Sequence, residues 1–102
     1  MSNYWNNQLC LPATELSATM TGSSVLIGTL VQSPVKIIFD NQSTDSVAIY
    51  INGTTSEHLW KTFEAGSALV LDQDLYTLGT GTRFYGVGAS GSFYISYLYL
   101  RQ

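Results

Sequence analysis

Residues that could carry out acid–base or metal chemistry are few in this sequence and lie far apart. His58 is the single histidine and Cys10 is the single cysteine. A structural zinc site draws about four ligands from cysteine, histidine and carboxylate side chains, and no second His or Cys is present to build one. We therefore expect His58 to be a solvated loop residue and Cys10 to be a small apolar side chain.

The patterns of hydrolases and nucleotide-binding proteins are also missing. No GxSxG-type elbow presents a serine to His58. The glycine pair at 79–81 lacks the lysine of a phosphate-binding loop. The carboxylates mostly fall in predicted turns, where capping of the backbone explains them: Asp40, Asp45, Glu57, Glu64, Asp72 and Asp74. We expect no catalytic residue, no metal and no cofactor, and hence a protein that is not an enzyme.

The composition indicates a small domain with few charged residues. The 102 residues fit one domain, and only 11% of them are charged, against about 25% in an ordinary soluble domain. The net charge of −3 disfavours nucleic acid and anionic membranes as partners. The N-terminus has no basic, apolar leader pattern and no run reaches the roughly 20 apolar residues of a membrane span. We therefore expect synthesis and folding in a cytoplasm.

The stretch from Arg83 to Arg101 constrains the fold most tightly. Glycines between two aromatic arms predict a hairpin, because glycine accepts the backbone angles of a tight reversal. Side chains alternate along a strand, so the second arm has two faces. One face is apolar throughout, with Phe93, Ile95, Tyr97 and Tyr99. The other becomes apolar towards its end, which predicts a strand that is covered on both sides.

About eight short segments of strand character follow one another at roughly ten-residue spacing, without helical periodicity. Asn52-Gly53 is the strongest hairpin signal among the connections. This pattern predicts an all-β, antiparallel β-sandwich over residues 14–102, either jelly-roll-like or immunoglobulin-like. Residues 1–13 form a separate N-terminal arm that is rich in asparagine and carries two aromatic residues and two leucines.

We expect the second face of the last strand and the arm to contact other chains. Burying a large apolar side chain is worth roughly 1.5–3 kcal/mol, so leaving several in water is costly for a small domain. A symmetric homo-oligomer, a trimer or a larger ring, would bury equivalent patches of each copy. The predicted interface residues are Tyr4, Trp5, Leu9, Tyr94, Leu98 and Leu100.

Three stretches resemble small virion proteins of tailed bacteriophages: PVKIIFDNQSTDSVAIYING (34–53), WKTF followed by AGSALVLD (60–72), and TRFYGVGASGSFYISYLYL (82–100). The resemblance covers over half of the chain and leaves out the first 30 residues. It implies a β-sandwich built into the particle as a capsid decoration, head–tail or fibre-base protein. It further implies virion partners such as the major capsid protein, and localisation in the virion after assembly in the host cytoplasm.

A carbohydrate-binding or receptor-recognition module is the alternative. Trp5, Trp60, Tyr76 and Tyr85 could stack on sugar rings, with loop amides supplying hydrogen bonds. Trp60 lies mid-strand beside Leu59, which favours a core role for it. Tyrosines serve interfaces equally well, because they bury a ring while the hydroxyl stays in water.

Overall fold

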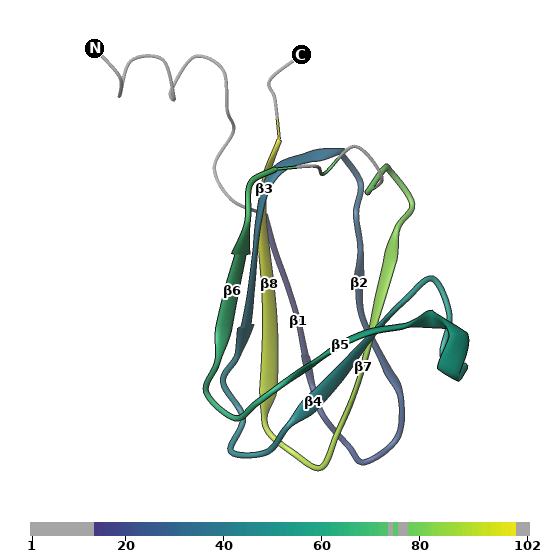
Figure 1. The fold of residues 1–102 in the computed structure, drawn as a ribbon, viewed down its shortest axis with the longest axis vertical. Helices are drawn as coiled ribbons and strands as arrows, with labels where there is room; N and C mark the ends of the chain where they lie inside the picture. Colours follow the sequence, from purple (N-terminus) through teal and green to yellow (C-terminus); the bar gives the residue numbers. More distant parts are fainter. Residues whose placement is uncertain (1–13, 74, 76–77, 100–102) are drawn as a thin grey trace.

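The computed structural model describes residues 14–73, 75 and 78–99. Over these residues the chain is a sandwich of two four-stranded antiparallel sheets, which confirms the predicted fold class (Figure 1). A 3-10 turn, η1 (Ser56–His58), precedes β5. The strands are β1 (Thr14–Thr19), β2 (Val25–Thr29), β3 (Pro34–Asn41), β4 (Val47–Ile51), β5 (Leu59–Phe63), β6 (Ala68–Leu71), β7 (Arg83–Gly88) and β8 (Ser92–Tyr99).

The strand order settles which kind of sandwich this is. One sheet has the order β1-β8-β3-β6 and the other has the order β2-β7-β4-β5. Two interleaved four-stranded sheets of this order form a jelly roll of eight strands. Of the two alternatives that the sequence left open, the structure therefore has the jelly-roll one.

The predicted hairpin between the two aromatic arms is wrong. β7 pairs with β2 and β4, whereas β8 pairs with β1 and β3, so the arms lie in opposite sheets. The link bends at Gly91, which has a φ of +85°. A Cβ there would come within 2.7 Å of the Ser43 Cα. Glycine is thus required for a crossing between sheets and for close packing, which produce the same sequence signal as a hairpin turn.

Asn52-Gly53 does join two paired strands, β4 and β5, although through a longer loop that contains η1. Asn52 has a φ of +63°. Its side-chain Oδ1 accepts a hydrogen bond from the Arg83 backbone N–H at 2.8 Å. The loop is therefore fastened to the start of β7.

The core consists of the inward faces of the two sheets. Phe93, Ile95 and Tyr97 of β8 are fully buried, which confirms the predicted apolar face over these three residues, while Tyr99 at its end is partly buried. Aromatic rings bridge the two sheets: the Phe39 and Phe84 centroids are 5.6 Å apart, and those of Phe63 and Phe93 are 5.2 Å apart, both edge to face. Such tilted pairs add about 0.5–1.5 kcal/mol beyond the burial of their area.

A buried asparagine ties two connections together at one end of the sandwich. Asn41 is 0% exposed. Its Nδ2 donates to the backbone oxygens of Asp45, Phe63 and Glu64 at 3.0–3.2 Å. Its Oδ1 accepts from the backbone N–H and the hydroxyl of Ser43 at 3.0 and 2.8 Å. The β3–β4 loop and the β5–β6 turn are thus held by a single amide.

We expect Asn41→Ala to lower the free energy of unfolding by about 3 kcal/mol, because each buried acceptor that loses its donor costs about 1–3 kcal/mol. Urea denaturation followed by tryptophan fluorescence measures this change. Gln42→Ala is the matched control, since Gln42 is exposed and its side-chain amide donates to the Asp40 carboxylate at the surface. A loss of under about 0.5 kcal/mol in both variants would contradict the role of Asn41.

Candidate interaction surfaces

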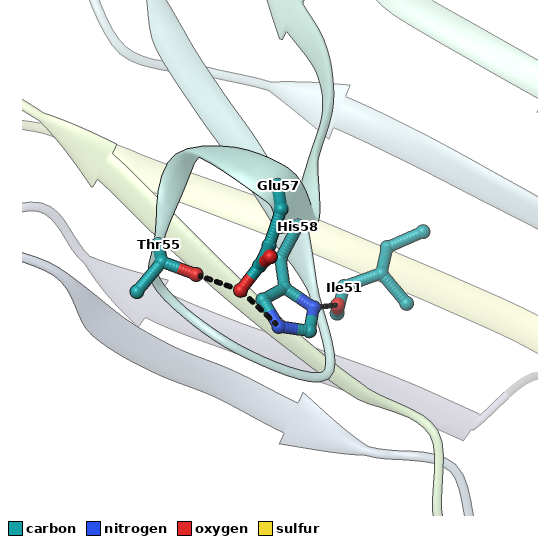
Figure 2. Close-up of polar contacts among 4 residues, drawn as sticks. All are labelled: Ile51, Thr55, Glu57 and His58. Atoms are coloured by element: carbon teal, nitrogen blue, oxygen red, sulfur yellow. Dashed lines mark hydrogen bonds and ion pairs between the residues drawn. The ribbon is translucent and has the colours of Figure 1, made fainter.

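The contacts of His58 indicate a structural role for this residue. Its Nδ1 lies 3.0 Å from the Ile51 carbonyl oxygen, so this nitrogen carries the proton and donates it (Figure 2). The other ring nitrogen, Nε2, is 3.9 Å from the Glu57 Oε1, which also accepts a hydrogen bond from the Thr55 hydroxyl. The ring covers Gly53, where a Cβ would meet the Nε2 at 2.6 Å. His58 therefore closes the β4–β5 loop, in line with the loop role expected from sequence.

Ionisable side chains do not converge elsewhere in the described part of the chain. Among residues 14–73, 75 and 78–99, no three His, Cys, Asp or Glu side chains lie close enough together to hold a metal ion. Over the same residues, no helix is both long and apolar enough to cross a membrane. The surfaces that remain as candidates are the faces of the two sheets and the space between them.

Four of the predicted interface residues lie outside the described residues: Tyr4, Trp5, Leu9 and Leu100. The other two, Tyr94 and Leu98, lie on the outward face of β8 and are partly buried. Tyr94 stands between Ser17 of β1 and Asp40 of β3, while Leu98 is paired with Lys36. Because β8 is a central strand, its neighbours already cover part of this face within one chain.

An apolar row crosses the outward face of the other sheet, where sequence reasoning did not place an interface. Leu26 is paired with Tyr85, Tyr85 with Tyr50, and Tyr50 with Leu59. Leu26 is 50% exposed and Leu59 is 46% exposed, and the two tyrosines between them are partly buried. We call Leu26, Tyr85, Tyr50 and Leu59 the outer row. It spans all four strands of the β2-β7-β4-β5 sheet.

The surroundings of the outer row carry little charge. The Arg83 guanidinium lies 6.0 Å from the centre of the Tyr85 ring, within reach of a cation–π contact. The next row along the same face is small and neutral, with Val87 paired to Ala48 and Ala48 to Thr62. Interface centres are likewise poor in charge and enriched in tyrosine and arginine. The outer row therefore has the composition of a protein contact surface.

A cavity of about 370 Å³ lies between the two sheets on the side of the edge strands β5 and β6. Residues of both sheets and of the β6–β7 connection line it: Phe39, Ile51, Trp60, Leu71, Gln73, Leu75, Leu78 and Phe84. Gln73 is the one residue with a polar amide side chain among the described residues of this lining. The described part of the lining is therefore suited to apolar groups.

Trp60 stands at the rim of this cavity, which differs from the core role that its position predicted. Its ring packs against Phe39, with the centroids 4.9 Å apart, yet the residue is 37% exposed. The register of β5 shifts at this point, with Tyr50 opposite Leu59 and Ile49 opposite Lys61. Trp60 is thus the extra residue of a bulge, and bulges redirect side chains at sheet edges.

Comparisons with known proteins leave the family open. No protein-family model matches the sequence. No curated protein matches it either. A solved structure of Bacillus endospore appendages, which form a family of disulfide-linked pili, contains a chain with 16% identity and a TM-score of 0.48 over 95% of this chain and 94% of that one. Both values are too low for any property of that protein to be transferred to this chain.

The contact between His58 and Gly53 leads to a prediction about stability. We expect Gly53→Ala to destabilise the wild-type fold by about 1–3 kcal/mol, because the new methyl group overlaps the histidine ring. In a His58→Ala background the same change should cost at least about 1 kcal/mol less, since the space is then free. A double-mutant cycle from urea denaturation measures the difference. Equal costs in the two backgrounds would show that the ring does not pack on Gly53.

Proposed function

We propose that this protein is a non-enzymatic structural subunit that acts through contacts between copies in a symmetric assembly. The outer row carries the proposal. It puts two half-exposed leucines and two tyrosines in line across a solvent-facing sheet of a chain in which 11% of residues are charged. Contiguous apolar patches of this kind are typical of interaction surfaces.

The more specific proposal is a component of a bacteriophage virion, as a capsid decoration, head–tail or fibre-base protein. Its support is the resemblance of residues 34–53, 60–72 and 82–100 to small virion proteins, together with the jelly-roll order, which is common in viral capsid proteins. Folds host many functions, so the strand order adds to the resemblance and cannot replace it. The partners would be further copies and other virion proteins such as the major capsid protein.

A carbohydrate-binding module is the second candidate, and one observation favours it. Tyr50 and Tyr85 are directly paired across adjacent strands and both reach the surface. Two neighbouring aromatic rings on a flat sheet can stack against successive sugar rings, and lectin domains are also found among jelly rolls. A glycan array probed with the purified protein tests this candidate.

Sedimentation of the purified chain over a range of concentrations tests the assembly proposal. We expect a trimer or a larger species, and a monomer at the highest soluble concentration would overturn the assembly proposal.

In the double variant Leu26→Gln, Leu59→Gln we expect the dissociation constant of the assembly to rise at least about tenfold, because two half-exposed leucines contribute on the order of 1 kcal/mol each. Val31→Gln is the control, since Val31 is 62% exposed and lies outside the outer row.

A further inference from the structure

We propose that the cavity between the sheets receives the N-terminal segment, residues 1–13, of a neighbouring copy. The inference rests on the proposed function, because it names one contact through which copies would assemble. It concerns a different surface from the outer row, so the two contacts can be tested separately.

The lining of the cavity defines the chemistry of its occupant. Phe39 and Phe84 are fully buried core residues that form part of the wall, and Trp60 stands at the rim with 37% of its surface exposed. The lining contains no charged side chain among the described residues that form it. A volume of about 370 Å³ falls in the range of roughly 300–1,000 Å³ that ligand pockets occupy. The fitting occupant is an uncharged segment that carries a few large apolar side chains.

The first 13 residues of the chain match this description. They include no Asp, Glu, Lys or Arg. Their large apolar or aromatic side chains include Tyr4, Trp5, Leu9 and Leu11. Asn6, Asn7 and Gln8 separate the two aromatic residues from the two leucines, and these amides can bond to the free backbone groups of an edge strand such as β5 or β6. The segment and the cavity are therefore matched in polarity.

The sheet register shows where the segment leaves its own sandwich. Thr14 is paired with Tyr97, Tyr97 with Ile37, and Ile37 with Leu71 of the cavity lining. Three such steps separate Thr14 from the cavity by about 15 Å. Tyr97 and Ile37 are fully buried, so core side chains occupy the straight line from Thr14 to this wall of the cavity. Extended, 13 residues reach up to about 43 Å, enough to enter a neighbour.

The topology also determines how the neighbour would be placed. β1 and β6 are the two opposite edges of one sheet, and the cavity opens on the β6 side. A head-to-tail arrangement brings the β1 edge of one copy to the cavity of the next. Contacts of this kind use two different patches on each copy, and they generate rings when the rotation closes and filaments when it does not.

Disulfide trapping in the full-length chain tests the inference. Cys10 lies within the segment and is the chain's single cysteine, so one engineered cysteine suffices. Gln73→Cys places it in the cavity lining, at an exposed position. Under mild oxidation we expect at least about tenfold more covalent dimer and higher species than for Ser23→Cys, because docking raises the local concentration of the thiol. Ser23 is exposed in the β1–β2 connection and does not line the cavity. Adding Cys10→Ser to Gln73→Cys should remove these species.

The outcomes separate the two proposals. A disulfide within one chain, seen as a monomer with altered mobility on a non-reducing gel, would overturn donation to a neighbour. Yields equal to those of Ser23→Cys would overturn docking in the cavity. If the unmodified chain sediments as an oligomer in either case, the assembly proposal stands and only this inference fails. A monomeric unmodified chain overturns the assembly proposal itself.

Discussion

The buried amide of Asn41 is the interaction on which the ordering of one end of the sandwich depends. It satisfies three carbonyl groups from two connections, and it orders Ser43, against which Gly91 packs. Buried polar groups without partners are costly, so a fully satisfied network of this kind permits one arrangement and penalises others. The connections β3–β4, β5–β6 and β7–β8 all cross between the sheets at this network. The jelly-roll order therefore depends on polar specificity as well as on the aromatic core.

The outward faces of the two sheets account for the low share of charged residues in the sequence. The outward side of the β2-β7-β4-β5 sheet has an apolar row and one arginine, where an ordinary soluble domain would place several charges. Near the outward side of β8, half-buried Tyr94 and Leu98 stand beside Asp40 and Lys36. The two faces thus differ in polarity, which suits a subunit that presents different surfaces to different neighbours.

Alternation and turn residues predicted the sandwich, the approximate strand positions and the inward face of β8, because burial imposes a period of two directly on the sequence. Pairing between distant strands leaves no such local mark. Leu26 and Tyr85 are 59 positions apart, and nothing near either residue shows that they are neighbours. Gly91 predicts a hairpin where the structure has a crossing between sheets for the same reason, since a tight bend requires glycine in both cases. The outer row and the cavity therefore could not be predicted from the sequence, because both are formed by residues that are distant along the chain.

The placement of β8 has a consequence for biogenesis. This strand lies between β1 and β3, so the first sheet lacks a central member until residues 92–99 are available. On a ribosome, β1 and β3 emerge long before their shared partner, and their unpaired edges stay open to other chains during that interval. Translation speed and chaperone capture should therefore affect the yield of native protein more than they would for a fold made of local hairpins.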